Sequence, residues 1–335
     1  MTIVKQKVFI TGGAGYAGSR YVPLLLDLGY HVTVFDTFYF GDYLQNHINL
    51  KKVKGDIRNL KLIEDSCLDH DIFIHLACMS NDTSFELDEN LSTEINYDCF
   101  DGMVKAAKQS GIKRFIYAST SSVYGISQAK DIKEDHPFKP LTLYNKYKGL
   151  CEPILFKYSD KDFETVIFRP ATLCGFSPRQ RFDLSVNILT AHAVVNNKII
   201  VFGGTQLRPN LHVLDYCDLL NLLISAEKTK IQNKIYNVGY QNLSIMQIAQ
   251  IVREVVLKQF PEKKEILIEG QKSNDLRSYH INSDKIKEEL NFKPKRTIED
   301  AVIEICDGFK RNAFDDALNN TAYFNVKKIK ELNIS

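Results

Sequence analysis

Several signals are missing from this sequence of 335 residues, and each absence excludes a class of protein. Lys and Arg number 43 and Asp and Glu number 41, so the formal net charge is only +2. A chain without a large excess of one sign has no strong field to attract nucleic acid or a membrane surface. No apolar segment reaches the roughly 18 residues that a membrane-spanning helix needs. We therefore expect a soluble globular protein that binds neither nucleic acid nor a membrane.

Paired cysteines and a leader segment are also missing. The seven cysteines are scattered, with no Cys-x-x-Cys pair and no metal-ligand spacing to histidine. Such an odd, dispersed set indicates buried thiols in a reducing cytoplasm, and we predict no metal site. The first apolar run after Met1 is a predicted strand rather than the core of a signal peptide. We expect a cytoplasmic protein.

The stretch from Val8 to Gly18 carries the strongest local signal that is present. A β-branched and aromatic run ends in clustered glycines, and an apolar helical pattern follows at once. These glycines fit the dinucleotide-binding fingerprint G-x-G-x-x-G and a close variant of it. A Cβ would block both the tight turn and the approach of a pyrophosphate to the helix N-terminus. We predict a phosphate cradle here, with an ordinary strand-to-helix turn as the alternative. The cofactor contacts would be Gly12, Gly15, Tyr16 and Ala17.

The second predicted strand favours one cofactor. His31 to Asp36 is rich in β-formers and ends in a carboxylate about twenty residues past the glycines, where such a group accepts hydrogen bonds from an adenosine ribose. Asp36 would repel a 2′-phosphate, and the residues from Thr37 to Phe40 include no arginine to bind one. We therefore predict NAD rather than NADP.

Apolar runs and helical patterns alternate through the first half of the chain, which indicates a parallel sheet covered on both faces. Two long amphipathic helices could pair with those of a second subunit, although helices that cover their own sheet show the same pattern. The predicted fold class is an α/β Rossmann-type doubly wound parallel sheet with a smaller, mixed α/β C-terminal lobe. We expect strands near 7–11, 31–36, 51–54, 72–76, 113–119 and 163–169, and the long helices near 89–110 and 143–160.

The strict alternation stops after Arg169, which divides the chain into parts. Residues 1–170 would form an NAD-binding domain, to which segments near 213–240 return. Residues 171–310 would form a partly interleaved substrate-binding lobe. Residues 311–335 are polar with sparse apolar anchors, so we expect a loose surface helix there.

Polar residues follow the third and fourth predicted strands, at the sheet edge where open α/β sheets bind ligands. Asp56, which is followed by Ile57, is positioned to accept a hydrogen bond from the adenine exocyclic amine. The alternative is a plain turn aspartate. Leu76 and Ala77 close the fourth strand, where backbone would pass beside the nicotinamide ribose. The next segment includes Asn81 and either touches substrate or caps a helix.

The chemistry is predicted from Tyr144 and Lys148, which one helical turn places on the same face of a helix. A phenol with an ordinary pKa of ~10 is a poor base near neutrality. A fixed ammonium beside it favours the phenolate, as does the positive charge of an oxidised nicotinamide. Tyr144 then serves as a general base toward a substrate hydroxyl. Thr120 would orient the same oxygen, and Lys148 would also hold the nicotinamide ribose. A second Tyr-x-x-x-Lys match, at Tyr323 and Lys327, we interpret as chance.

These motifs stand in an order that resembles the extended short-chain dehydrogenase/reductase family, over roughly residues 7–305. Within it, the chain is similar to the NAD-dependent nucleotide-sugar epimerases and dehydratases. The resemblance implies NAD and a nucleotide-sugar substrate, and the two long helices predict a homodimer. It rests on residues 11–18, 55–57, 75–77, 119–120 and 123–125, on Tyr144 with Lys148, on Arg169-Pro170 and on residues 236–239.

The resemblance also implies substrate contacts. Arg208 and Arg277 resemble arginines that grip a substrate diphosphate, with surface arginines as the alternative. Residues 177–187 are similar to a segment of the GDP-heptose C4 dehydrogenases. Arg179, Arg181 and Asn187 would then touch the substrate, or the arginines would form a solvated charge cluster.

Departures from the family pattern reduce the number of candidate reactions. Ser121 and Ser122 stand where the dehydratases carry an acid, and a hydroxyl cannot do a carboxylate's proton transfer, so dehydration is disfavoured. Thr172 stands where epimerases usually carry Asn. With Asn81 and Ser121 as further substrate contacts, we expect C4 oxidation of a nucleotide-linked sugar by a 4-epimerase for surface polysaccharide precursors. The alternatives are a net C4 dehydrogenase, a catalytically inactive NAD sensor, and a reductase of a small alcohol or steroid.

Overall fold

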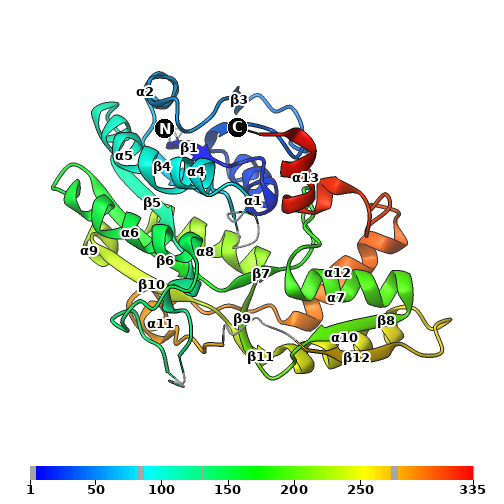
Figure 1. Ribbon diagram of the computed structural model, residues 1–335. Helices are drawn as coiled ribbons and strands as arrows, with labels where there is room; N and C mark the ends of the chain where they lie inside the picture. Colours follow the sequence, from blue (N-terminus) through cyan, green and yellow to red (C-terminus); the bar gives the residue numbers. More distant parts are fainter. Residues whose placement is uncertain are drawn as a thin grey trace.

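The computed structural model describes residues 5–80, 84, 87–127, 129, 131–272 and 278–334. Seven parallel strands form its central sheet, in the order β10-β6-β5-β4-β1-β2-β3 (Figure 1). The order reverses after β1, as it does in doubly wound sheets. The strands are β1 (Lys7–Thr11), β2 (His31–Asp36), β3 (Leu50–Lys54), β4 (Ile72–His75), β5 (Arg114–Ala118), β6 (Glu164–Pro170) and β10 (Lys234–Val238).

Successive side chains of a strand point to opposite faces of this sheet, so a separate apolar core forms on each face. In β1, Val8 and Ile10 pack into one cluster, whereas Phe9 packs into the other. The first cluster is completed by α1 (Tyr16–Asp27) and α8 (Val213–Ser225), and the second by α2 (Leu60–Cys67), α5 (Cys99–Gln109) and α6 (Leu143–Lys157). Strands buried on both faces are expected to read as nearly continuous apolar runs, as β1, β4 and β5 do, whereas the edge strand β3 carries three lysines. The predicted α/β fold class is confirmed.

One predicted helix has an interruption. The helix expected near 89–110 consists of α4 (Glu89–Thr93), a π-helical segment η1 (Glu94–Asp98) and α5. The wider turn directs Asn96 at the chain beyond β4, where its amide accepts from the N–H of Met79 at 2.8 Å and donates to the Met79 oxygen at 3.0 Å. The π-helical turn therefore fixes one edge of the segment that leaves β4.

The smaller lobe is built on two short sheets. The three-stranded sheet has the order β11-β9-β7, and β12 pairs with β8. Helices α7, α10 and α12 pack over β8 in a third apolar cluster. The elements are β7 (Thr172–Cys174), β8 (Lys198–Phe202), β9 (Leu207–His212), β11 (Gln241–Ser244), β12 (Leu267–Gln271), α7 (Ser185–Asn196), α10 (Ile245–Gln259) and α12 (Ile298–Lys310). The remaining elements are η2 (Ser121–Tyr124), α9 (Lys228–Ile231) and α11 (Asp284–Leu290).

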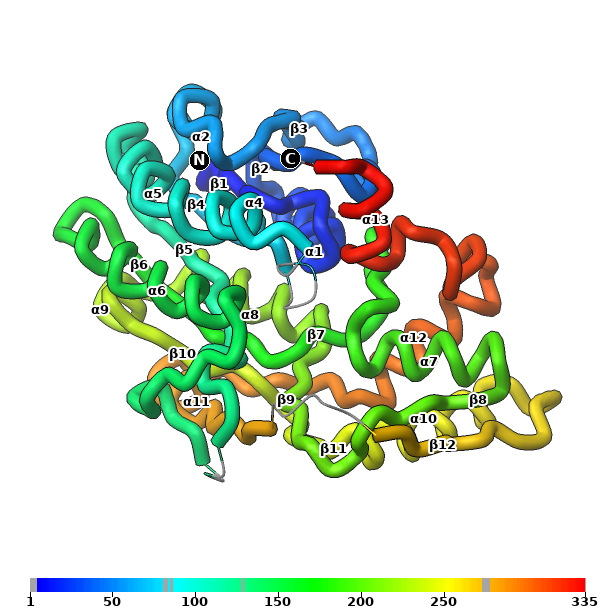
Figure 2. Tube along the Cα trace, viewed as in Figure 1, coloured from blue at the N-terminus to red at the C-terminus, as the bar shows by residue number. Residues whose placement is uncertain are grey.

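The end of the chain differs from the loose surface helix that the sequence predicts. After α12 the chain returns from the smaller lobe to the sheet domain, forming η3 (Thr321–Tyr323) and α13 (Asn325–Leu332) (Figure 2). Tyr323 and Asn325 are buried, and the ring of Tyr323 packs edge-on against Phe182 with 5.4 Å between centroids. A few apolar anchors were visible in the sequence, but their docking partner was not. The domain boundaries at 170 and 310 stay predictions.

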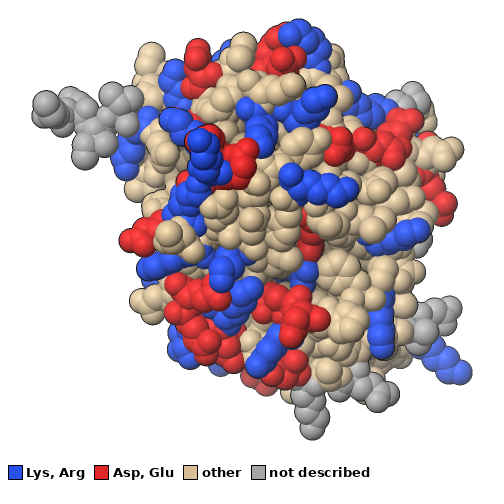
Figure 3. Space-filling view, turned by 90° about the vertical axis from the view of Figure 1, so that its left-hand side faces the viewer, with Lys and Arg blue, Asp and Glu red and all other residues tan. Residues whose placement is uncertain are grey.

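The surface carries interspersed charges. Lys and Arg side chains alternate with Asp and Glu over the face shown in Figure 3, with uncharged surface between them. All seven cysteines are free thiols, and six of them are buried, as the sequence predicts. In the part of the chain that the structure describes, helices fall short of the length and apolarity required to cross a bilayer.

Candidate active site

One cavity of about 860 Å³ lies at the carboxyl ends of the central strands, with the smaller lobe on its other side. The segments after β1, β2, β4, β5 and β6 all contribute to its wall, so the fold gathers side chains that lie far apart in the sequence. Of the predicted site residues, those that line it are Gly12, Gly15, Tyr16, Ala17, Asp36, Asp56, Ile57, Leu76, Ala77, Thr120, Ser121, Tyr144, Lys148, Arg179, Arg181 and Arg208.

The turn after β1 requires glycine at two positions. Gly12 has a φ of +73°, and a Cβ on it would lie 2.6 Å from the backbone nitrogen of Ala77. A Cβ on Gly18 would lie 2.5 Å from the carbonyl oxygen of Gly13. Side chains at these positions would force the turn away from β4 and α1 away from β1. The tight turn leaves the N-terminus of α1 facing the cavity, where free N–H groups and the helix dipole favour an anion. These residues therefore fit the diphosphate of a dinucleotide.

Asp36 ends β2 beside this turn. Its carboxylate accepts hydrogen bonds from the N–H groups of Ala14 at 3.0 Å and Phe38 at 2.9 Å. Burial raises the pKa of Asp36, although these bonds and the charge of Arg179 oppose that rise. An acceptor here suits the hydroxyls of an adenosine ribose. The guanidinium of Arg179 stacks on the ring of Phe40, 4.0 Å from its centroid, so an arginine from a distant segment reaches this end of the cavity.

Asp56 lines the same end and also holds a turn. Arg58 donates to it from its backbone nitrogen at 2.8 Å and from Nη2 at 2.9 Å. Burial acts to raise the pKa of Asp56, but the hydrogen bonds from Arg58 outweigh burial and lower it. Both alternatives considered from the sequence, a ligand contact and a turn residue, are compatible with this geometry. Leu76 continues from β4 with its N–H donating to Thr11 at 3.0 Å.

Tyr144 and Lys148 lie on α6, whose start is capped by Thr142 through a hydrogen bond from the N–H of Asn145 at 3.3 Å. The Nζ atom of Lys148 donates to the carbonyl oxygen of Ala118 at 2.5 Å. This bond ties the middle of α6 to the end of β5, two residues before Thr120. The three predicted catalytic residues therefore line one wall of the cavity.

The electrostatics of this wall differ from the sequence argument. Burial raises the pKa of Tyr144, while the charge of Arg181 and a hydrogen bond with Thr120 act to lower it. Burial also lowers the pKa of Lys148. From the sequence, Lys148 is predicted to be the group that favours the phenolate. In the structure, Arg181 and Thr120 act in that direction, and Lys148 is held against the end of β5.

Of the predicted substrate contacts Arg208 and Asn187, only Arg208 lines the cavity. Arg208, on β9, lines the cavity from the smaller lobe, and its Nη1 donates to the Leu207 oxygen at 3.0 Å. Asn187 is fully buried and is not among the lining residues; its Nδ2 donates to the hydroxyl of Tyr16 at 3.2 Å and to the Arg181 oxygen at 2.9 Å. Asn187 thus supports the loop that carries Arg179 and Arg181. Asn81 and Arg277 lie outside the described residues, and their roles stay predictions.

Some residues of the cavity are not predicted from the sequence. Asn325 lines it from α13 and Tyr279 from a segment before α11, whereas Ser80 belongs to the segment after β4 that is predicted to touch substrate or cap a helix. The Oγ atom of Ser121 donates to the hydroxyl of Tyr279 at 3.5 Å. No local pattern distinguishes Asn325, which lies inside the second Tyr-x-x-x-Lys match that we interpret as chance. Its position depends on how the end of the chain folds back.

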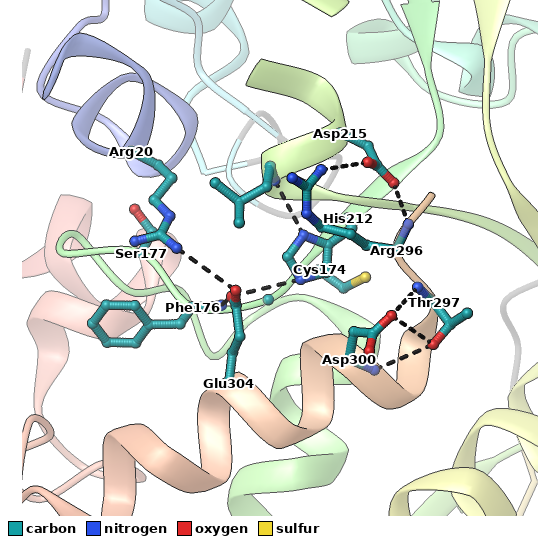
Figure 4. Close-up of polar contacts among 12 residues, drawn as sticks. Arg20, Cys174, Phe176, Ser177, His212, Asp215, Arg296, Thr297, Asp300 and Glu304 are labelled. Carbon is teal, nitrogen blue, oxygen red and sulfur yellow. Dashed lines mark hydrogen bonds and ion pairs between the residues drawn. The ribbon is translucent and has the colours of Figure 1, made fainter. Parts of the chain in front are cut away.

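Behind the cavity, charged residues join the two lobes (Figure 4). Glu304 of α12 lies 3.6 Å from Arg20 of α1 and 3.5 Å from Nε2 of His212, and it accepts from the N–H of Phe176 at 3.3 Å. Nearby, Arg296 binds Asp215 of α8 at 2.6 Å. These contacts fix the chain between Cys174 and Ser177, from which Arg179 extends. Within the described ranges, no three His, Cys, Asp or Glu side chains form a group that could hold a metal ion.

The chain is similar to known proteins over most of its length. The family model described as the NAD dependent epimerase/dehydratase family matches residues 8–239. A UDP-glucose 4-epimerase of Streptococcus mutans is 28% identical, covering 86% of this chain and 92% of the relative. A dTDP-D-glucose 4,6-dehydratase of Mus musculus is also 28% identical, covering 92% and 89%. The solved UDP-N-acetylglucosamine 4-epimerase of Methanobrevibacter ruminantium M1 superposes with a TM-score of 0.82 at 23% identity, over 92% of this chain and 100% of that one.

Proposed function

The chain belongs to the NAD dependent epimerase/dehydratase family, and from this membership we propose that it oxidises C4 of a nucleotide-linked sugar as a 4-epimerase for surface polysaccharide precursors. Membership agrees with the predicted family and with NAD as the cofactor. One observation carries the choice of reaction: Thr120, Tyr144 and Lys148 line one cavity with the glycine turn, and Ser121 and Ser122 follow Thr120 where the dehydratase pattern has an acid.

NAD, when bound, supplies a hydride acceptor that can return the hydride to the opposite face of the oxidised sugar. Gly12 and Asp36 would hold its diphosphate and its adenosine ribose. Lys148 would hold the nicotinamide ribose. Arg208 would grip the substrate diphosphate from the opposite wall, since its planar donor fork matches that group.

Tyr144 of α6 and Thr120, which follows β5, would carry out the proton transfer. The Oη atom of Tyr144 would remove the proton from the C4 hydroxyl and return it after the sugar has turned over. Thr120 donates or accepts at the same oxygen and keeps it oriented. Burial favours the neutral phenol, and the nearby charge of Arg181 acts against burial by favouring the phenolate.

The experiment is an incubation of the purified protein with UDP-, GDP- and dTDP-sugars, followed by mass spectrometry and NMR. An epimer of unchanged mass supports the proposal, and a dehydrated keto-deoxy sugar contradicts it. Tyr144→Phe should lower kcat by roughly 10²- to 10⁴-fold with bound NAD retained. Tyr158→Phe, at the other end of α6, is the matched control and should keep its activity. A Tyr144→Phe variant with full activity would reject the proposed base.

A second candidate is a net C4 dehydrogenase. Two features of the sequence favour it: residues 177–187 are predicted to resemble a segment of the GDP-heptose enzymes, and Thr172 departs from the epimerase pattern. The same incubation separates the two, because a dehydrogenase accumulates a 4-keto sugar and one NADH for each turnover. We also propose a cytoplasmic homodimer that pairs through α5 and α6.

A further inference from the structure

Two buried arginines face the cavity next to the end of the chain. Arg179 and Arg181 are 2% and 8% exposed, yet both line the cavity. Nη2 of Arg179 donates to Oδ1 of Asn325 at 2.6 Å, and Nε of Arg181 donates to Asp183 at 2.8 Å. Nε of Arg179 and Nη2 of Arg181 are buried without a hydrogen-bond partner. A buried, partly unsatisfied guanidinium costs free energy unless an anion binds it.

The surroundings of Arg179 indicate which anion this is. Its backbone N–H donates to Oγ of Ser19 on α1 at 3.2 Å, and Oγ of the nearby Ser177 donates to the Tyr16 oxygen at 2.6 Å. Its guanidinium lies over Phe40, past the end of β2. The arginine is therefore anchored to the turn where a dinucleotide places its diphosphate. Arg208, the predicted ligand of the sugar nucleotide, lies on β9 in the other lobe.

Asn325 connects this loop to the segment after β4. Its backbone N–H donates to Oδ2 of Asp183 at 2.9 Å, and its Nδ2 donates to Oγ of Ser80 at 2.7 Å. Nη1 of Arg181 donates to the same Ser80 oxygen at 3.1 Å. Together these bonds close a ring through Ser80, Arg181, Asp183 and Asn325, with α13 forming one side of it.

The rest of α13 continues across the cavity. Ile329 and Ile334 line it together with Asn325. The residues just before α13 are bound to the loop of the arginines, where the N–H of Phe182 donates to the Tyr323 oxygen at 2.9 Å. Figures 1 and 2 show α13 lying between the sheet domain and α7 of the smaller lobe.

We propose that Arg179, Arg181 and Asn325 form a diphosphate clasp, by which α13 closes over the bound dinucleotide and slows its release. The proposal rests on the dinucleotide site of the proposed function and is independent of the sugar chemistry. A retained cofactor suits an epimerase, which ends each cycle with the NAD it began with. A net dehydrogenase has to exchange its cofactor, so opening of α13 would limit its turnover.

The first test measures binding and release on the full chain without any sugar. NADH binding is followed by its fluorescence, and release by dilution into excess NAD. Arg179→Gln should weaken NADH binding by roughly 10- to 100-fold, as expected for a lost charge-assisted contact. Asn325→Ala should speed NADH release by about 10-fold or more. Lys330→Ala, on the exposed side of α13, is the matched control and should change neither quantity by more than about twofold.

Ligand fragments identify the group that the arginine binds. Arg179→Gln should weaken ADP-ribose, which contains the diphosphate, far more than AMP, which does not. Unchanged NADH and ADP-ribose binding together with loss of UDP or GDP binding would assign the arginine to the sugar nucleotide and overturn the proposal. A loss confined to NADPH would assign it to a 2′-phosphate and would also overturn it.

A second test needs no variant. Limited proteolysis of the natural protein should cut the segment after α12 more slowly when NADH or ADP-ribose is present, and AMP or UDP should not protect it. Equal cutting with and without NADH would show that α13 does not close over the dinucleotide. Neither test depends on Tyr144, so failure of the clasp and failure of the proposed epimerase can be told apart.

Discussion

The hydroxyl of Ser122 lies 2.5 Å from Oδ1 of Asn145, the residue that follows Tyr144. The same hydroxyl lies 2.8 Å from Oγ1 of Thr120. Ser122 therefore connects the helix that carries the phenol to the threonine that would orient the substrate. In this chain the position has become a support for Thr120 rather than an acid.

This support should be measurable. Ser122→Ala removes one hydrogen bond from Thr120, so we expect kcat to fall by roughly 2- to 10-fold with little change in NAD content. Steady-state kinetics on the nucleotide sugar that the incubation identifies would show it. Ser225→Ala, on the far side of the protein in α8, is the control. An unchanged kcat in Ser122→Ala would mean that Thr120 keeps its orientation unaided.

We expect the buried ion pair between Glu152 and Arg169 to contribute strongly to the free energy of unfolding. Glu152 accepts from Nε of Arg169 at 2.9 Å and from Nη2 at 2.6 Å, and it also accepts from Ser119 at 2.6 Å. Both charged side chains are buried. Glu152→Ala leaves the guanidinium unpaired and should lower the free energy of unfolding by about 3–5 kcal/mol in urea titrations. Replacing both partners by Met should cost less than the single change, and a larger loss in the double variant would contradict this explanation.

Stability should fall on mild acidification because of His212. Burial, followed by the charge of Arg296, lowers its pKa to about 4, whereas the unfolded value is about 6.5. Between these two values the unfolded chain binds more protons, so stability is lost as pH falls through that window. From pH 7.5 to pH 5 the loss from this group should be about 2 kcal/mol.

Two variants separate this effect from that of its neighbour. His212→Asn should flatten the dependence of unfolding free energy on pH between 5 and 7, because asparagine does not titrate in this range. The local structure should be kept, since the amide oxygen can still accept from Leu214, as Nδ1 of His212 does at 3.1 Å. Burial raises the pKa of Glu304, which gives the opposite sign, so Glu304→Gln should steepen the acid loss. Equal slopes in all three proteins would reject His212 as the source.

The predicted homodimer can be tested at Leu150, which is 40% exposed on α6. A charge placed in an apolar helical interface is left without a partner, so Leu150→Glu should shift a dimer to monomer in light-scattering chromatography. Leu267→Glu on β12 replaces a leucine that is somewhat more exposed, at 49%, and should leave the dimer intact. A monomeric natural protein would contradict the prediction outright.

The parts of the site predicted from sequence are those whose spacing is local. Gly12 and Asp36 are joined by one strand-helix-strand unit, so their approach follows from β1, α1 and β2 alone. Tyr144 and Lys148 share one helix. Residue type and spacing are enough in these cases.

The rest depends on contacts between distant segments. Asn325 reaches Asp183 only because the end of the chain returns from the smaller lobe to the sheet domain, and no periodicity in a polar tail encodes that path. The pKa of Tyr144 depends on its burial and on Arg181, neither of which the Tyr-x-x-x-Lys pattern contains. Asn187 has a residue type suited to a ligand contact, yet its side chain bonds to the backbone of Gly175 and Arg181 and to the hydroxyl of Tyr16 on α1.

The π-helical turn at Glu94–Asp98 holds one residue more than a regular helix needs at this place. Its hydrogen bonds span five residues where those of an α-helix span four, so the wider turn takes about one extra residue for the same rotation. Deleting one residue there would restore a regular helix while α5 keeps its apolar side on the sheet, but Asn96 would no longer be directed at Met79. The same deletion inside α5 would turn the residues that follow it by roughly 100°, away from the sheet. Loss of one codon should therefore be tolerated better within the π-helical turn than a few residues further on.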